Sequence, residues 1–171
     1  YNMNFLINLK EIKSYFLKKE NIYFSAIIII IFSFDRISKL EIINKFNQSS
    51  YYVNDFINLD LIWNTGIGFG IFSTDSNLLY NLISFTIGSV IIILMYALIV
   101  SKKIDKLIYS IIIGGALGNF YDRILYKAVP DFIDLHYGNF HWFTFNLADI
   151  FISLGVIAYI FKDINLKKKN E

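Results

Sequence analysis

The stretch Leu78–Val100 constrains the fold of this chain more than any other part of the sequence. It runs for 23 residues without a charged side chain, which is enough for a helix to cross the roughly 30 Å hydrocarbon core of a bilayer. The composition agrees, because 56 % of the residues are hydrophobic and 17 of the 171 are Phe. Together these features exclude an ordinary soluble domain and predict an integral membrane protein.

Three further helical spans are predicted from the remaining apolar runs. The first run follows a basic lead, an order that a cleavable signal peptide would also show. No small-residue cleavage site follows it, and Asp35 to Lys39 continue the helical pattern, so an uncleaved span is favoured. Residues 1–171 are expected to form a single membrane-embedded domain, with spans at about 22–45, 77–100, 107–125 and 145–161.

The expected fold class is all-α, with four transmembrane helices and a small extracytoplasmic β-sheet. The sheet is placed at about 47–74, which is rich in Tyr, Val, Ile, Trp and Asn and alternates in polarity from Phe56 to Leu61. Residues 126–144 contain the only proline, Pro130, and are expected to form a loop. Residues 1–20 are typical of an amphipathic lead lying on a membrane face.

The distribution of basic residues predicts the orientation of the chain. Eleven of the 16 Lys and Arg residues lie in the N-terminal lead, in the turn at 101–106 or in the C-terminal tail. The positive-inside rule makes that side cytoplasmic. Both termini are therefore expected in the cytoplasm, and the sheet and the segment 126–144 on the outer side.

Composition also excludes several kinds of chemistry. The chain has no cysteine, so a thiol nucleophile, a disulfide and a thiolate metal site are excluded. The formal net charge is only +2, and no basic stripe with interleaved aromatic residues indicates a nucleic-acid partner.

Two predicted spans each carry a stripe of small and polar residues near the same membrane face. Lipid cannot solvate a carboxylate, so the two stripes are expected to face each other and to form one site. They consist of Gly115, Asn119 and Asp122 on the third span and Asn146, Asp149 and Ser153 on the fourth.

The carboxylates are expected to divide by role. Asp122 lies beside Arg123 and near Asn119, and a structural role is favoured because an adjacent arginine keeps a carboxylate ionised. Asp131 and Asp149 lack a basic neighbour and lie at the membrane edge, where burial and a like charge drive two pKa values apart. Such a pair can hydrolyse a peptide without a metal or a cofactor, because the ionised carboxylate takes a proton from water while the protonated one polarises the carbonyl.

Other candidate groups are weaker. His136 and His141 are five residues apart, so a helix would not place them on one face, and interfacial histidines are favoured over metal ligands. Asp134 has no assigned role.

Two further patterns point away from other chemistry. Ser38 and Lys39 are adjacent and point apart on a helix, which argues against a Ser–Lys dyad. Gly66, Gly68 and Gly70 are not followed by the Lys-Ser/Thr of a phosphate loop, and they are interpreted as a tight turn where a substrate passes.

Five segments in chain order carry a family resemblance: Asp35–Lys39, Asn64–Gly70, Gly114–Arg123, Val129–Phe132 and Phe145–Asp149. They resemble the motifs of lipoprotein signal peptidases, the bacterial signal peptidase II family. The third segment matches the pattern Gly-Gly-x-x-Gly-Asn-x-x-Asp-Arg closely. Any one segment would be weak alone, whereas five in order are strong.

The resemblance implies an aspartic endopeptidase of the bacterial cytoplasmic (inner) membrane, with its active site at the outer leaflet. Its substrates would be prolipoproteins that carry diacylglycerol on the cysteine after the signal peptide, cut on the amino side of that cysteine. The resemblance also implies contact with membrane lipid, binding of lipopeptide inhibitors such as globomycin, and action as a monomer.

Residue by residue, the resemblance assigns catalysis to Asp131 and Asp149 and an outer contact with the substrate to Asn64 and Gly66. Support of the site is assigned to Asn119, Asp122, Arg123 and Asn146, and the first-helix pair Asp35 and Lys39 is interpreted as structural before catalytic. This chain departs from the family pattern in three places. Arg36 and Ser38 replace the usual Gln and Thr, and Pro130 precedes Asp131. Gly68 replaces the usual Ala, and this change is expected to loosen the sheet. None removes a catalytic group.

Two other classes of function remain as alternatives. A small transporter or proton-relay protein also uses intramembrane carboxylates, but it predicts inverted repeats or broken helices, which the sequence does not display. A structural or assembly module would use the polar stripes only to hold helices together, and changing its aspartates to asparagine would cost only stability.

Overall fold

A computed structural model describes residues 18–45, 50–66 and 76–170 of the chain. The predicted amphipathic lead at 1–20 lies almost wholly outside these residues, and so do Gly68 and Gly70 of the predicted glycine turn.

Most of the described chain is helical. The helices are α2 (Lys19–Lys45), α3 (Asn77–Val100), α4 (Lys103–Tyr126) and α5 (Leu147–Asn170). Helix α3 has the bounds predicted for the second span, and the other three helices are longer than the predicted spans. Helix α5 begins two residues after the predicted start at 145 and continues past the predicted end at 161.

Among the described helices, α3 alone is both long and apolar enough to pass for a membrane span on composition. Helices α2 and α4 carry charged residues in their apolar stretches, and several of these side chains are buried, including Asp35, Lys39 and Asp122. The structure thus confirms a mostly helical chain with a small antiparallel sheet, and it contains one helix that meets the test for a membrane span by itself.

Helix α4 contacts each of the other three helices, and its glycines permit this. A Cβ atom on Gly114 would lie 2.8 Å from a side-chain atom of α2, and one on Gly115 would lie 2.6 Å from the carbonyl oxygen of Ala148 on α5. A Cβ atom on Gly118 would overlap the carboxylate of Asp35. Small residues on α4 therefore let the backbones of α2 and α5 approach closely.

In the described part of the chain, four strands form one antiparallel sheet in the order β1-β2-β3-β4. Strands β2 and β3 pair in the middle of the sheet and join two distant parts of the chain, with Trp63 opposite Pro130 and Ile62 opposite Asp131. The strands are β1 (Tyr51–Asn54), β2 (Ile57–Asn64), β3 (Val129–Tyr137) and β4 (Phe140–Phe145).

The prediction of a loop at 126–144 is wrong, and so is the placement of the whole sheet at 47–74. Half of the sheet comes from the hairpin of β3 and β4, while residues 67–75 lie outside the described part of the chain. Strand β3 is buried along most of its length, and it contacts helices α2 and α4 as well as its neighbouring strands. It therefore lacks the alternation that marks a half-exposed strand.

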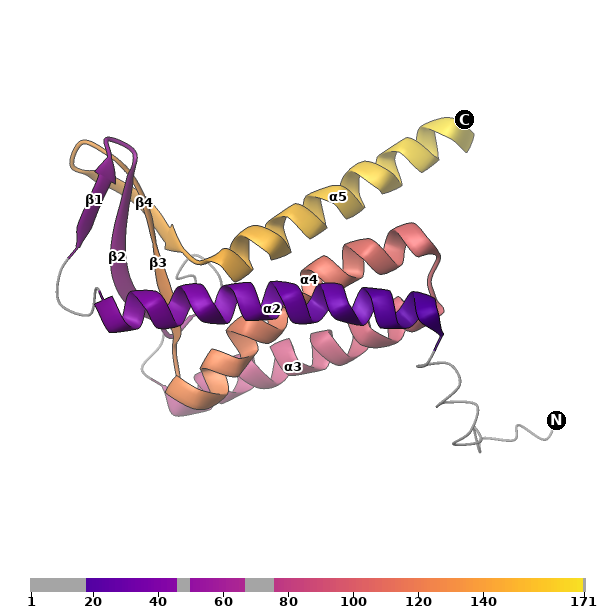
Figure 1. Cartoon of the computed structure of the whole chain (residues 1–171), viewed down its shortest axis with the longest axis horizontal. Coiled ribbons are helices and arrows are strands. Elements are labelled where there is room, and N and C mark those ends of the chain that lie inside the picture. Colours follow the sequence, from indigo (N-terminus) through magenta and orange to yellow (C-terminus); the bar gives the residue numbers. More distant parts are fainter. Residues whose placement is uncertain (1–17, 46–49, 67–75, 171) are drawn as a thin grey trace.

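The sheet lies at one end of the helices (Figure 1). The first residues of α2, the turn between α3 and α4 and the last residues of α5 lie at the opposite end (Figure 1). The lysine-rich parts of the described chain are thus separated from the sheet by the length of the helices.

Candidate active site

Asn146 and Asp149 form the start of α5. The side-chain oxygen of Asn146 accepts a hydrogen bond from the backbone N–H of Asp149 at 3.1 Å, and the backbone N–H of Asn146 donates to Asp149 Oδ2 at 3.2 Å. This reciprocal arrangement is a capping box, which satisfies backbone donors that the first turn of a helix leaves open. The local sequence Asn-x-x-Asp therefore fixes the position of the Asp149 carboxylate.

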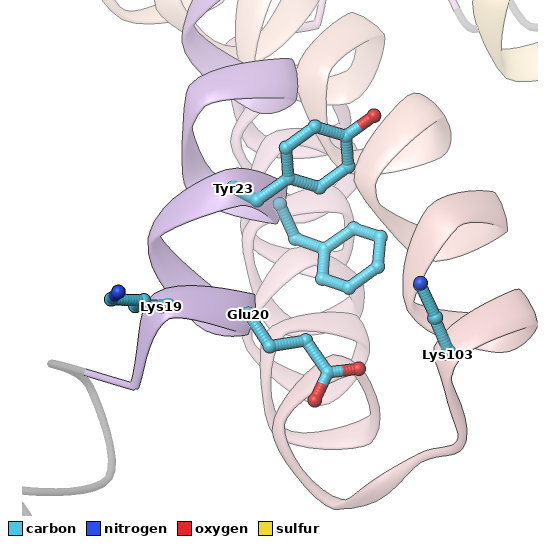
Figure 2. A pocket seen from close by; sticks show the side chains of 5 residues that line it. Lys19, Glu20, Tyr23 and Lys103 are labelled. Atoms are coloured by element: carbon cyan, nitrogen blue, oxygen red, sulfur yellow. The ribbon is translucent and has the colours of Figure 1, made fainter.

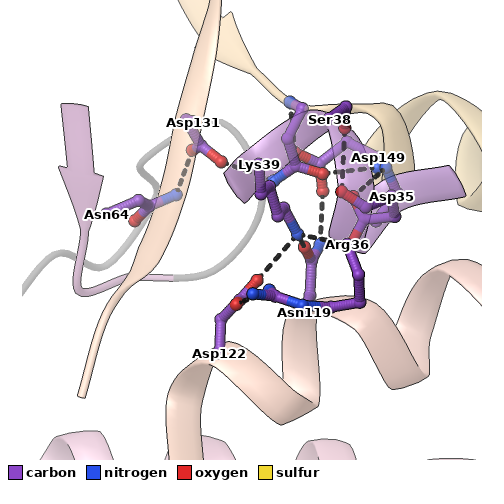
Figure 3. A network of polar contacts seen from close by, with 11 residues as sticks. Asp35, Arg36, Ser38, Lys39, Asn64, Asn119, Asp122, Asp131 and Asp149 are labelled. Atoms are coloured by element: carbon purple, nitrogen blue, oxygen red, sulfur yellow. Dashed lines mark hydrogen bonds and ion pairs between the residues drawn. The ribbon is translucent and has the colours of Figure 1, made fainter. Parts of the chain in front are cut away.

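Strand β3 brings Asp131 to the same place. Asp131 Oδ1 accepts a hydrogen bond from the side-chain amide of Asn146 at 2.6 Å, and Oδ2 accepts one from Asn64 at 2.8 Å (Figure 3). The residue is 2 % exposed, and Asp149 is 7 % exposed. Asn146 therefore contacts both carboxylates, one through its side chain and one through its backbone.

Burial raises the pKa of Asp131 to about 7, and the negative charge of Asp149 contributes to the rise. Hydrogen bonds from Asn64 and Asn146 oppose the shift without cancelling it. A carboxylate pair with one raised pKa can hold a single proton near neutral pH, which lets one member act as an acid and the other as a base.

A second polar cluster joins α2 and α4 next to this pair. Lys39 Nζ lies 2.8 Å from Asp35 Oδ2, 2.8 Å from Asp122 Oδ2 and 2.7 Å from Asn119 Oδ1 (Figure 3). The amide nitrogen of Asn119 then donates to Asp149 Oδ1 at 2.8 Å. The predicted first-helix pair Asp35 and Lys39 is thus part of the same network as the aspartates.

Asp35 also reaches the start of α5. Its Oδ1 atom accepts a hydrogen bond from the backbone N–H of Ala148 at 3.0 Å. Because this N–H belongs to the first turn of α5, Asp35 ties α2 to the helix end that carries Asp149.

The expectation that Arg123 holds Asp122 is wrong. Asp122 pairs with Arg36 and Lys39 of α2, because adjacent residues on a helix point in different directions. Sequence reasoning recorded Arg36 only as a departure from the family pattern and missed this role. A buried arginine in an apolar helix needs a carboxylate partner, which is the signal that could have found it.

Arg123 instead contacts the chain around β2. Its Nη2 atom donates to the backbone carbonyl of Gly66, and its guanidinium lies 5.8 Å from the centre of the Tyr80 ring. Gly66 in turn donates its backbone N–H to Asn64 Oδ1 at 2.7 Å. The structure therefore brings Asn64, Gly66 and Arg123 together beside Asp131.

The two histidines are closer than their spacing suggested. They face each other across the β3–β4 hairpin with stacked rings, and Nδ1 of His141 lies 2.7 Å from Asp134 Oδ2. A spacing of five residues would separate them on a helix, whereas the hairpin pairs His136 with His141 directly. Within the described ranges, no three His, Asp or Glu side chains are grouped so as to hold a metal ion.

Two cavities differ in their relation to the carboxylates. A groove of about 220 Å³ lies beside Asp149 and is lined mainly by apolar side chains of β4 and α5, including Phe145 and Ile150. A cavity of about 570 Å³ lies between the first turns of α2 and α4, with Lys19 and Lys103 on its walls (Figure 2). Of these two, the groove is the one that adjoins the aspartate pair.

Comparison with known sequences decides the family. The family described as Signal peptidase (SPase) II matches residues 27–165. A lipoprotein signal peptidase of Pelagibacter ubique (strain HTCC1062) is 47 % identical over 158 residues, which cover 89 % of this chain and 95 % of the relative. The chain belongs to the signal peptidase II family.

A second relative and a solved structure support the same family assignment. A lipoprotein signal peptidase of Anaplasma phagocytophilum (strain HZ) is 41 % identical over 145 residues, covering 83 % of this chain and 90 % of the relative. A solved structure described as a bacterial membrane enzyme has 28 % identity and a TM-score of 0.71, covering 87 % of this chain and 92 % of that one. The chain is therefore a membrane protein and a peptidase of the signal peptidase II family.

Proposed function

We propose that Asp131 and Asp149 are the catalytic pair of an aspartic endopeptidase. The observation that carries this proposal is the double contact of Asn146, which donates its side-chain amide to Asp131 and its backbone N–H to Asp149. The raised pKa of Asp131, caused by burial and then by the charge of Asp149, supports a pair that holds one proton at neutral pH.

The reaction needs only water and this pair. The ionised carboxylate takes a proton from water as the water oxygen bonds to the scissile carbonyl carbon, and the protonated carboxyl gives its proton to the carbonyl oxygen. The tetrahedral intermediate then collapses: the protonated carboxyl gives its proton to the amide nitrogen, the other carboxylate takes a proton from a hydroxyl of the intermediate, and the carbon–nitrogen bond breaks. One proton remains shared by the two aspartates at the end of the cycle.

Membership of the signal peptidase II family assigns the removal of lipoprotein signal peptides to this chain. The substrate is a prolipoprotein that carries diacylglycerol on the cysteine after the signal peptide, and the cut falls on the amino side of that cysteine. The apolar groove beside Asp149 supports a substrate with an apolar part close to the scissile bond. Lipopeptide inhibitors such as globomycin bind the same site.

Asn64, Gly66 and Arg123 contact the substrate backbone next to the pair. Arg123 is buried, and its Nε and Nη1 atoms have no hydrogen-bond partner in the described part of the chain. Buried guanidinium donors without partners are costly, so a peptide carbonyl is a suitable acceptor for them.

The chain crosses the bacterial cytoplasmic membrane four times and acts as a monomer, with both termini in the cytoplasm. The arrangement of the elements supports this, because the sheet lies at the opposite end of the helices from the lysine-rich ends of α2 and α5 (Figure 1). The charged residues of α2 and α4 that face each other do not contact lipid, so they are compatible with spans. The aspartate pair then lies at the outer leaflet.

The test is cleavage of a diacylglyceryl-modified prolipoprotein by purified protein in detergent. Asp131→Asn and Asp149→Asn are each expected to lower the rate by about 1,000-fold or more, as removal of a catalytic group usually does. Asp134→Asn is the matched control, because Asp134 is a buried aspartate on the same strand that contacts His141. It is expected to cleave at close to the wild-type rate.

A folded Asp131→Asn or Asp149→Asn variant with the wild-type rate would overturn the assignment of the pair. Cleavage of a precursor without diacylglycerol at an equal rate would show that the enzyme does not require the lipid on its substrate. The assignment of Asp131 and Asp149 as the catalytic pair would then still stand.

A further inference from the structure

We propose that Lys39 positions Asp149 for the reaction by fixing the direction in which the side-chain amide of Asn119 points. The proposal rests on the proposed catalytic pair and adds a positioning residue to it.

Lys39 has no capacity left for a direct role. Its side chain is 0 % exposed, and its ammonium group lies within 2.8 Å of three acceptors on Asp35, Asn119 and Asp122 (Figure 3). An ammonium group has three N–H donors and no acceptor. Lys39 therefore donates hydrogen bonds to Asp35 and Asn119 and forms an ion pair with Asp122. Apart from its charge, it can act on the reaction only through a neighbour.

Asn119 is the neighbour that can transmit such an effect. Its side-chain amide has an acceptor oxygen on one side and donor hydrogens on the other. The oxygen faces Lys39, which can only donate, and the nitrogen faces the carboxylate of Asp149. The reversed orientation would place N–H groups against the ammonium and an oxygen against the carboxylate, so Lys39 selects the orientation that donates to Asp149.

The Asp149 carboxylate is held at both oxygens. Oδ1 receives the hydrogen bond from Asn119, and Oδ2 receives the hydrogen bond from the backbone of Asn146. Loss of the first would leave the carboxylate free to turn about its remaining contact. A displacement of about 1 Å in a reacting group can cost about 100-fold in rate.

The other partners of Lys39 are less dependent on it. Asp122 also pairs with Arg36, and Asp35 also accepts from the backbone N–H of Ala148. Removing the Lys39 ammonium therefore leaves each carboxylate one polar contact, whereas the Asn119 oxygen loses the cation that orients it.

The test compares Lys39→Met with Lys39→Gln. Methionine removes both the donors and the charge, and kcat is expected to fall by about 100-fold with little change in KM. Glutamine lacks the charge but keeps N–H groups that can donate to Asn119, so it is expected to retain at least about ten times the kcat of Lys39→Met.

The charge has a separate readout in the pH profile. The pKa of Asp131 is raised by burial and by Asp149, and it is lowered by hydrogen bonds from Asn64 and Asn146 and by the charge of Lys39. Both Lys39 variants are therefore expected to move the loss of activity at high pH to a still higher pH. This shift reports the loss of the charge alone, so the orientation of Asn119 is read from the difference in kcat between the two variants.

Lys106→Met is the matched control. Lys106 is also a buried lysine that links α4 to α2 through an asparagine, with its Nζ atom 2.7 Å from Asn21 Oδ1. It lies in the first turn of α4, about 20 Å along the helix from Asn119. The change is expected to lower stability while leaving kcat and the pH profile of the remaining folded protein at wild-type values.

A double-mutant cycle with Asn119→Ala tests the route of the effect. If Lys39 acts through Asn119, the double variant loses no more kcat than Asn119→Ala alone. If Lys39→Met gives no folded protein, the cycle is run with Lys39→Gln.

Wild-type kcat in folded Lys39→Met, equal kcat in the Met and Gln variants, or losses that multiply in the cycle would each overturn the proposal. These results would leave the catalytic pair intact as long as Asp149→Asn remains inactive. An active Asp149→Asn would instead remove the pair on which the proposal rests.

Discussion

Asn146 uses the two ends of its side-chain amide for different purposes. The oxygen caps α5 by accepting from the backbone N–H of Asp149, and the nitrogen donates to Asp131. An aspartate here could cap the helix but would place a negative charge against Asp131. A serine could cap the helix, but its hydroxyl is too short to reach the second carboxylate as well.

Two substitutions of Asn146 separate these purposes. Asn146→Ala removes both, and we expect it to lower the free energy of unfolding by about 1 kcal/mol and to abolish most of the cleavage. Asn146→Ser keeps the cap, so it should unfold close to the wild type and still lose cleavage. Unfolding in detergent and cleavage of the lipidated precursor measure the two effects, and wild-type cleavage by Asn146→Ser would contradict this role.

The pKa of Asp131 predicts how stability and activity change with pH. Burial and the charge of Asp149 raise this pKa from 3.8 to about 7, so between these values the folded protein binds a proton that the unfolded chain has released. The free energy of unfolding therefore falls as pH rises through this window, by on the order of 4 kcal/mol. Cleavage should fall above about pH 7 as the pair loses its last proton.

Asp131→Asn isolates this contribution. The decrease in the unfolding midpoint from pH 5 to pH 8 should be smaller in the variant than in the wild type, because asparagine does not titrate. An identical decrease in both proteins would contradict the shifted pKa.

The sequence predicted that polar side chains of the third and fourth spans lie together, as Asn119 and Asp149 do, but it did not predict the partner of Asp122. Asp131 and Asp149 could be separated from Asp122 because neither has a basic neighbour in sequence. The same reasoning paired Asp122 with Arg123, whereas the cation beside it in space is Arg36 from another helix. Neighbours across a helix interface cannot be read from adjacency along the chain.

The segment 126–144 shows why the sheet could be only partly predicted from the sequence. Residues 51–64 alternate enough to indicate strands, but β3 is buried on most of its positions and contains Pro130, a residue that usually argues against a central strand. The pairing of β3 with β2 depends on helices α3 and α4 returning the chain to the same end of the molecule. This path of the chain is part of the tertiary structure, so the local sequence of β3 does not predict the pairing.

The contact of α4 with α2 gives a prediction for two glycines. Gly118→Ala would push a methyl group into the Asp35 carboxylate, and Gly114→Ala would push one into the apolar side chain of Ile31. Both variants should be less stable, but only Gly118→Ala should also lower kcat, because it displaces a partner of Lys39. Equal kcat in the two variants, measured on folded protein, would contradict this account of the interface.

For the whole molecule, the separation of the sheet from the lysine-rich helix ends predicts which parts reach each side of the membrane. The chain has no cysteine, so a single introduced cysteine is the only thiol of the protein that a labelling reagent can modify. Asn139→Cys, at the exposed tip of the β3–β4 hairpin, should react with a membrane-impermeant thiol reagent in intact spheroplasts. Lys168→Cys, near the exposed end of α5, should react only after the membrane is opened, and the reverse pattern would contradict the orientation.

We propose that a strand and the helix after it supply two aspartates that act as one catalytic unit. The most direct test is the rate of cleavage of diacylglyceryl-modified prolipoprotein by Asp131→Asn, Asp149→Asn and the double variant. When two residues act as a unit, removing either one abolishes the contribution of both. The three variants should therefore cleave at the same low residual rate. A double variant slower than either single variant by the product of their effects would contradict the claim.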